Sequence, residues 1–202
     1  MLLLAAALVA ALTVRPAGGH LAALGQVRMR LVPAILGALC LQVVIISVLP
    51  QGSPGLHRVL HVASYALAAA FLVANRRIRG TWIIALGSAL NLVAILANDG
   101  VMPASRSALR AAGIATKSQG FANSSAVAHP RLLQLGDILF VPKPWPLHNV
   151  FSIGDICIAI GVMIAVHALS GSRLVKPRVR ATDHRSDRQT YPRRPTVERS
   201  GL

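Results

Sequence analysis

Five apolar stretches alternate with short connectors that carry arginine, and this alternation constrains the fold more than any other feature of the chain. A helix needs about 20 mostly apolar residues to cross the ~30 Å hydrocarbon core of a bilayer. Most of the stretches approach that length, so the pattern predicts an all-α integral membrane helical bundle with about five transmembrane helices. We expect these helices over residues 1–16, 31–49, 56–74, 81–98 and 151–170.

The first stretch is short, and its alternative interpretation is a cleaved signal peptide. No basic residue precedes the apolar run and no clear small-x-small cleavage site follows it, which favours a retained helix. The membrane domain is therefore expected over residues 1–170, with an extracytoplasmic segment over residues 99–150.

The arginine residues predict the orientation in the cell membrane, because lysine and arginine next to membrane helices stay on the cytoplasmic side. The connectors after the first and third stretches contain Arg15, Arg28, Arg30, Arg76, Arg77 and Arg79. With both connectors inside, the N-terminus is extracytoplasmic and the C-terminus is cytoplasmic. The 99–150 segment then lies outside despite its basic residues, because the rule loses force in long loops.

Most of the positive charge behind the formal net charge of +15 lies in the two arginine-bearing connectors and at the end of the chain, because six of the 21 basic residues occupy the connectors and nine follow Gly171. Residues 171–202 are rich in Arg, Ser, Thr, Pro and Asp, so we expect a disordered cytoplasmic tail that is dispensable for folding. Such a cluster is attracted to anionic lipid headgroups, by roughly 1 kcal/mol per basic residue. Membrane lipid is therefore the expected partner of the tail, and nucleic acid is not. A protein partner is not identified.

The extracytoplasmic segment is predicted to be partly helical. Residues 104–112 have the composition of a helix that ends at Gly113, and residues 117–128 are typical of a flexible loop. Residues 131–140 are mostly apolar but too short to span, which favours a short helix in the outer interface with Trp145 at headgroup depth.

Placing a polar residue inside an apolar membrane helix costs free energy of insertion. Such residues are therefore the best indication of a functional site. Before the tail the chain has only three acids, and all are expected at the outer ends of helices or in the extracytoplasmic segment. His57, His61, Ser64 and Tyr65 form one helical stripe, and these features together predict an outward-facing polar cavity. The candidate ligand-binding residues are Asn98, Asp99, Asp137, Asp155, His61 and Asn91.

Several of these residues have structural alternatives. Ser152 and Asp155 have the spacing of a capping box, and Asn91 is suited to a hydrogen bond with a neighbouring helix. His57 and His61 have the spacing of a metal pair, but the glutamate of an HExxH helix is missing, so interfacial packing is favoured. No metal, cofactor or catalytic residue is predicted. Four glycines are expected to allow close helix approach: Gly80, Gly87, Gly154 and Gly161.

A Gly-Asp-Ile triplet occurs twice, at residues 136–138 and 154–156. Paired carboxylates at a membrane surface can bind a cation, an amine or a phosphate-bound metal. If Asp137 and Asp155 share a site, the extracytoplasmic segment must fold back over the outer end of the last helix. The alternative is a structural role, in which Asp155 caps its helix and Asp137 lies in solvent.

Three motifs resemble those of a family of uncharacterised bacterial membrane proteins, the domain of unknown function 5317. The sequence Ala-Gly-Gly-His-Leu-Ala-Ala-Leu at 17–24, with Arg28 and Arg30, is similar to its first cytoplasmic loop. The sequence Asn-Asp-Gly-Val-Met-Pro at 98–103 is similar to its Asn-Gly-Gly-x-Met-Pro motif, with Asp99 in place of glycine. The sequences around the two Gly-Asp pairs resemble its paired outer motif. The resemblance covers about residues 1–169 and implies the five-helix layout, but no reaction.

The chain is thus expected to bind or handle a small or lipid-derived ligand, or a partner protein, at the outer leaflet. One alternative is a membrane-embedded enzyme that acts on a lipid-linked or phosphorylated substrate through Asp155, Asp137 and His61. The other alternative is an accessory subunit of a larger membrane complex. Nucleophile-elbow, Walker, CxxC and dinucleotide-binding motifs are absent from the sequence.

Overall fold

The structure is a computed structural model that describes residues 2–48, 53–114, 124–125, 127, 129–145 and 148–175. Its long helices are α1 (Leu2–Val14), α2 (Val32–Val43), α3 (Pro54–Ala74), α4 (Thr81–Ala97) and α6 (Ile153–Leu169). They coincide with the five predicted helices, so the mostly helical fold is confirmed. The shorter elements are η1 (Leu21–Gln26), η2 (Val44–Val48), β1 (Met102–Pro103), α5 (Arg106–Ala111), β2 (Ser124–Ser125), η3 (Leu133–Leu135), β3 (Leu139–Val141) and β4 (Asn149–Phe151).

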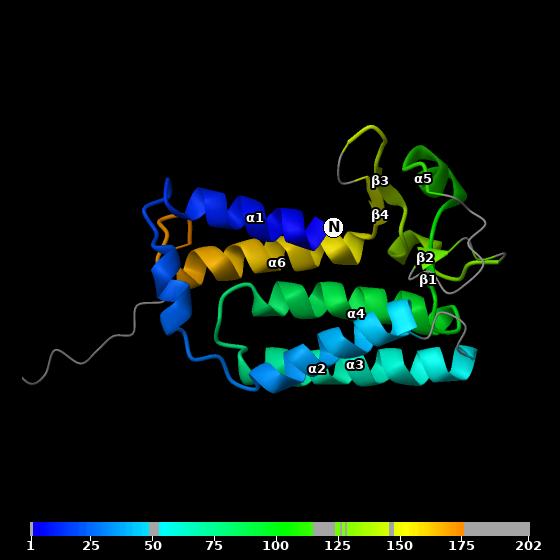
Figure 1. Cartoon of the computed structure of the whole chain (residues 1–202), viewed down its shortest axis with the longest axis horizontal. Helices are drawn as coiled ribbons and strands as arrows, with labels where there is room; N and C mark the ends of the chain where they lie inside the picture. The colour runs from blue at the N-terminus through cyan, green and yellow to red at the C-terminus, as the bar shows by residue number, and fades with distance from the viewer. Residues whose placement is uncertain are drawn as a thin grey trace, which may run out of the picture.

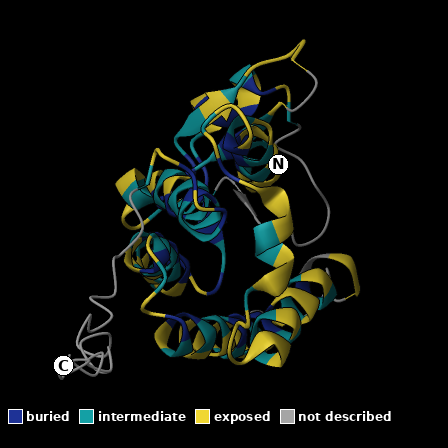
Figure 2. Cartoon of the chain, turned by 90° about the vertical axis from the view of Figure 1, so that its left-hand side faces the viewer, coloured by how far each residue is buried: buried dark blue, intermediate teal, exposed yellow. Residues whose placement is uncertain are grey.

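The five long helices lie along a common axis in an open arc. Helix α1 packs on α6, α6 on α4, α4 on α3, and α3 on α2. Helices α1, α3 and α6 start at one end of the molecule, whereas α2 and α4 start at the other (Figure 1). The series of helices does not close on itself, because no extended contact joins α1 to α2 in the described residues, and these two helices form its ends (Figure 2).

The two ends of the bundle differ in charge. One end, here called the arginine end, holds the connectors 15–31 and 75–80 and the residues after α6 (Figure 1). The opposite end, here called the capped end, is covered by the 99–150 segment. Every acid among the described residues lies at the capped end. The described arginines of the arginine end are Arg15, Arg28, Arg30, Arg76, Arg77, Arg79 and Arg173.

Helices α4 and α6 approach each other through paired glycines, as predicted. A Cβ added at Gly87 would lie 2.4 Å from the carbonyl oxygen of Gly154, and one added at Gly80 would lie 2.2 Å from that of Gly161. Because no larger side chain fits at these distances, the glycines allow the two backbones to pack closely. This contact places the start of α6 directly beside the middle of α4.

The 99–150 segment contains more extended structure than the sequence predicts. The predicted helix over residues 104–112 is confirmed by α5, and Gly113 ends it with a φ of 64°. The helix predicted over residues 131–140 is wrong, since only the single turn η3 forms before β3 begins. Strand β3 pairs with β4 in antiparallel register, and this pairing satisfies backbone groups that a short helix would leave open at its ends. Most of the predicted loop 117–128 lies outside the described residues.

Length and composition identify one candidate membrane span in the described part of the chain, Gly55–Ala74 in α3. Helices α1, α2, α4 and α6 are apolar but shorter. Helix α2 changes to a π-helix after Val43, which divides its apolar stretch into two elements.

The chain continues in ordered contacts beyond the predicted boundary of the tail. Ser172 is fully buried and lies 3.0 Å from Nδ1 of His167, whose Nε2 lies 3.1 Å from the hydroxyl of Thr13. The backbone N–H of Arg173 donates to Ala17. Residues 171–175 thus join the ends of α1 and α6, whereas the rest of the predicted tail lies outside the described residues.

Candidate functional site

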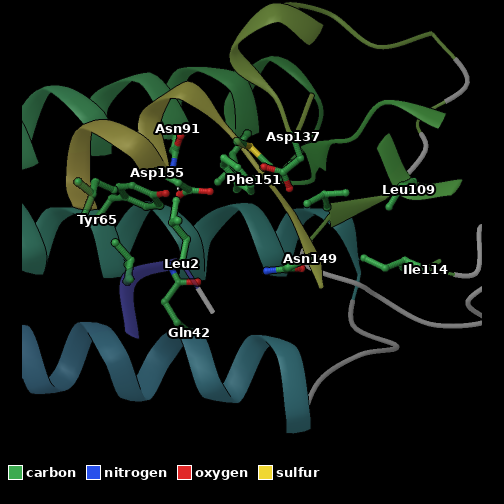
Figure 3. Close-up of a pocket in the computed structure, with 15 residues that line it drawn as sticks. Leu2, Gln42, Tyr65, Asn91, Leu109, Ile114, Asp137, Asn149, Phe151 and Asp155 are labelled. Atoms are coloured by element: carbon green, nitrogen blue, oxygen red, sulfur yellow. Dashed lines mark hydrogen bonds between the residues drawn. The ribbon is translucent and has the colours of Figure 1, made fainter. Parts of the chain in front are cut away.

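A cavity of about 510 Å³ lies at the capped end of the bundle. Helices α1, α2, α3, α4 and α6 all contribute to its wall, and the 99–150 segment lines one side of it (Figure 3). Its polar lining residues are Gln42, Tyr65, Asn91, Asp137, Asn149 and Asp155. Its apolar lining residues are Leu2, Leu3, Ile95, Met102, Leu109, Ile114, Val150, Phe151 and Ile158.

One wall of the cavity is a closed hydrogen-bond network between α4 and the start of α6. The Asn91 amide donates to Asp155 at 2.8 Å and accepts from the Ser152 hydroxyl at 2.8 Å. Ser152 and Asp155 also form a reciprocal capping box, in which each side chain accepts from the other residue's backbone N–H. Capping and a position in the cavity wall therefore coexist at Asp155, and Asn91 forms the interhelical bond that its sequence position suggested.

Asp137 is held over the cavity by its backbone. Its N–H donates to the Pro103 carbonyl at 2.9 Å, and its carbonyl accepts from the N–H of Ser105 at 3.0 Å. The preceding Gly136 makes this pairing possible, because an added Cβ would lie 2.2 Å from the Pro103 oxygen. The Asp137 residue is only 3% exposed. The interpretation that leaves Asp137 in solvent is therefore wrong.

The two carboxylates thus line the same cavity, as the shared-site hypothesis requires. Asp155 lies with Asn91 and Tyr65 inside the bundle, and Asp137 lies on the side of the 99–150 segment (Figure 3). The segment has folded back over the start of α6, so that two motifs 18 residues apart in the sequence contribute to one cavity.

Asn98 lies outside this cavity and has a structural role. Its side chain donates to the carbonyls of Ala94 and Arg131, at 2.8 and 2.7 Å, and accepts from the Arg131 N–H at 2.8 Å. Both hydrogens of the amide nitrogen are thereby used, and the amide oxygen accepts one bond. The Asn98 side chain fastens the 99–150 segment to the end of α4.

Asn75 makes the same set of bonds at the arginine end of the bundle. It donates to Phe71 and to the Arg30 carbonyl, and it accepts from the Arg30 N–H. Each long connecting segment is therefore clamped to a helix end by one asparagine, which bonds both backbone groups of one arginine.

Two further candidates also lie away from the lining. Asp99 has a positive φ of 57°, its side chain is 81% exposed, and it forms an ion pair with Arg58 on the surface. His61 is buried, with 1% exposure, on the stripe that includes Ser64 and His57. Ser64 accepts a hydrogen bond from Gln42 at 2.8 Å, which ties this stripe of α3 to α2.

The cavity residues offer few ligands for a metal ion. No group of three or more histidine, cysteine, aspartate or glutamate side chains that could hold a metal occurs in the described residues. Both oxygens of Asp155 already accept hydrogen bonds, from Asn91 and from the backbone of Ser152. The chemistry of the lining suits an apolar body with a polar or charged group.

Asn149 and Phe151 are lining residues that the sequence analysis did not select. Both belong to β4, immediately before the Ser152 cap, so their proximity to the second Gly-Asp motif was the available signal. Tyr65 belongs to the polar stripe described above, and Gln42 is likewise a polar residue inside an apolar stretch. The structure places them on the cavity wall.

The profile of a family of unknown function, DUF5317, matches residues 26–167, which is more than half of the chain. The chain belongs to this family. The resemblance inferred from the motifs is thus confirmed, and the matched region contains all six candidate residues and nearly the whole cavity wall. No curated protein and no solved structure matches the chain.

Proposed function

We propose that this DUF5317 member is a multi-pass protein of the cell membrane whose cavity binds a small or lipid-derived ligand at the outer leaflet. One observation carries the binding function: the cavity of about 510 Å³ joins two acids, Asp137 and Asp155, with nine apolar residues in its wall. Ligand pockets are typically about 300–1,000 Å³ and combine apolar side chains with placed polar groups. This cavity has that volume and contains both kinds of side chain.

The outer surface of the bundle supports a lipid environment. The five long helices contain only two charged residues, Arg58 and Asp155, and both lie near the capped end. Large exposed apolar surfaces are uncommon on water-soluble monomers. Yet every long helix exposes large apolar side chains, among them Leu4, Leu8, Leu12, Leu36, Leu39, Val43, Val59, Val62, Val73, Trp82, Leu86, Val93, Ile153 and Ile160.

The interior of the bundle supports the same interpretation. Its helix contacts use glycines between α4 and α6, and its buried residues include Ser64, Asn91 and His167. Membrane helices associate through small residues and interhelical hydrogen bonds, because lipid tails are as apolar as leucine. An apolar exterior around a small and polar interior is the arrangement expected in a bilayer.

Four of the helices are short for a complete crossing, and this shortfall can be accommodated. Helices α4 and α6 have 17 residues each. At 1.5 Å per residue they are about 26 Å long. Local thinning of the bilayer and interfacial flanking residues reconcile such lengths with a ~30 Å core at modest cost.

The charge distribution supports one orientation. The positive-inside rule assigns the arginine end, with its seven arginines among the described residues, to the cytoplasm. The capped end and its cavity then face outward, and the C-terminal basic residues are placed where they can contact anionic lipid headgroups.

Enzymatic use of the cavity is less well supported than binding. The catalytic alternative relied on His61 together with the two acids, and His61 is not among the residues that line the cavity. The lining combines hydrogen-bonding groups with apolar side chains and lacks a histidine, cysteine or lysine among the described residues. Binding requires no more than this.

Mass spectrometry of gently purified full-length protein tests the proposal. Wild-type protein is expected to retain a bound small molecule or lipid through detergent exchange. Leu3→Trp, which fills the cavity, should lose most of it. Leu4→Trp should retain it, because Leu4 is 66% exposed and is not a lining residue. Retention that is equal in both variants, or a stoichiometric protein partner with no small ligand, would contradict the proposal.

A further inference from the structure

The charge of the cavity wall limits which ligands it can accept. Its described lining residues include the acids Asp137 and Asp155, and no lysine, arginine or histidine. An anionic group placed here would be repelled by these carboxylates. In a partly buried site that repulsion is screened less than it would be on the surface.

Asp155 is the informative member of the pair, because its hydrogen-bond partners are all neutral. Its oxygens accept from the Asn91 amide and from the Ser152 N–H, and its own N–H donates to the Ser152 hydroxyl. The start of α6 also stabilises the negative charge through the helix dipole. A carboxylate has about four lone-pair positions, so two acceptor positions of Asp155 are left for a group in the cavity.

The position of the cavity in the arc indicates how a ligand reaches it. Leu2 and Leu3 of α1 and Gln42 of α2 belong to the lining, and these two helices form the ends of the open arc (Figures 2 and 3). Helix α1 packs mainly on α6 and α2 mainly on α3, and no extended contact joins α1 to α2 in the described residues. Because these two helices make no extended contact, we infer that a ligand enters between them, from the lipid of the proposed outer leaflet.

We propose that the ligand is a cationic amphiphile, with an amine or quaternary ammonium group and an apolar chain; this inference rests on the proposed function. Its cationic group binds at Asp155, close to Asp137, and its chain passes between α1 and α2. The polar groups of Gln42 and Tyr65 lie on the same wall and can accept hydrogen bonds from an amine. The apolar lining residues contact the first part of the chain.

Isothermal titration calorimetry in phosphatidylcholine nanodiscs tests this ligand class, with empty nanodiscs as the reference. The probes are dodecyltrimethylammonium, dodecyldimethylamine oxide, which has the same chain and no net charge, and tetramethylammonium, which has the charge without the chain. For wild-type protein, we expect dodecyltrimethylammonium to bind roughly tenfold more tightly than the amine oxide, equivalent to about 1.4 kcal/mol. Tetramethylammonium should bind more weakly than either.

Asp155→Asn should remove most of this preference while retaining an oxygen that accepts from Asn91. Asp99→Asn is the matched control, because Asp99 lies at the same end of the molecule but its side chain is 81% exposed and outside the cavity. It should leave the affinity within about twofold of wild type, since the charge of an exposed side chain is screened by solvent and salt. Circular dichroism establishes whether both variants fold, and the comparison of probes on wild-type protein needs no variant.

Equal affinity for the cation and the amine oxide would overturn the cationic class. Failure of every probe to bind a protein that still retains a copurified lipid would overturn it too, but would leave the proposed function intact. If no probe binds and no ligand copurifies, both proposals fail.

Discussion

Gly154→Ala is the substitution whose effect follows most directly from the geometry. Gly154 is the second residue of α6, and a Cβ there would lie 2.0 Å from the Asn91 amide oxygen and 2.7 Å from the Gly87 carbonyl. Neither neighbour can move aside freely. The Asn91 side chain is held by hydrogen bonds to Ser152 and Asp155, and the Gly87 carbonyl is part of the backbone. The structure must therefore give up either these hydrogen bonds or the close approach of α4 and α6.

The expected cost can be estimated from either response. If Asn91 rotates away, two hydrogen bonds are lost, at about 1 kcal/mol each. If the helices separate instead, overpacking typically costs about 1–3 kcal/mol. The better helix propensity of alanine returns up to about 1 kcal/mol, and less in a first turn. We therefore expect a loss of about 2 kcal/mol in the free energy of unfolding.

Gly55→Ala is the matched control, because Gly55 is the second residue of α3 and an added Cβ there meets nothing within 4 Å. It should be neutral or slightly stabilising. Reversible unfolding in mixed detergent micelles, followed by circular dichroism, measures both variants. Asn91→Ala should reduce the penalty of Gly154→Ala when the two are combined, because it removes the nearest clash. Equal stability of the Gly154 and Gly55 variants would refute this account of the helix contact.

Other substitutions test the remaining contacts. Asn98→Ala should lower the free energy of unfolding by about 2–3 kcal/mol, because three hydrogen bonds are lost, and it should speed limited proteolysis between residues 129 and 145. Asn75→Ala should lower the free energy of unfolding by as much without faster cleavage in that region. Similar digestion patterns of the two variants would contradict the proposed role of Asn98 in holding the 99–150 segment. Truncation after Val175 should leave the thermal midpoint in detergent unchanged, whereas truncation after Ser170 should lower it, because it removes a fully buried serine bonded to His167. Arg58→Ala should change the stability by less than about 1 kcal/mol, as for other exposed ion pairs, and a larger loss in a salt titration would show that this pair is more than a surface contact.

The helices were predictable because their signals are local. Apolar length, the Ser152–Asp155 cap and the spaced glycines of α4 and α6 each depend on a few neighbouring residues, and the structure confirms all of them. The 99–150 segment was not predictable in the same way. Residues 131–140 are apolar enough for a helix, but the pairing of β3 with β4 determines their conformation through partners eight or more residues away.

The candidate site was only partly predictable for the same reason. The repeated Gly-Asp pair drew attention to Asp137 and Asp155, and the structure places both residues in the lining of one cavity, where Gly136 allows the close backbone pairing with Pro103. Asn98 and Asp99 are close to lining residues in sequence, yet the Asn98 amide bonds to Ala94 and to the Arg131 backbone, and the Asp99 side chain is exposed on the surface. Sequence position alone does not distinguish a side chain that lines a cavity from one that holds the loop above it.

The central claim is that several helices cross the bilayer with the cavity outside, and thiol accessibility in intact cells tests it most directly. Single cysteines replace Gly25, Ser105 and Ser186 in a Cys40→Ala/Cys157→Ala background, and an impermeant maleimide is applied before and after lysis. The account predicts that only the cysteine at position 105 reacts before lysis. If α3, the one helix of sufficient length, were the only span, positions 105 and 186 would lie on the same side and opposite to position 25. Matching reactivity at positions 105 and 186 would contradict the account.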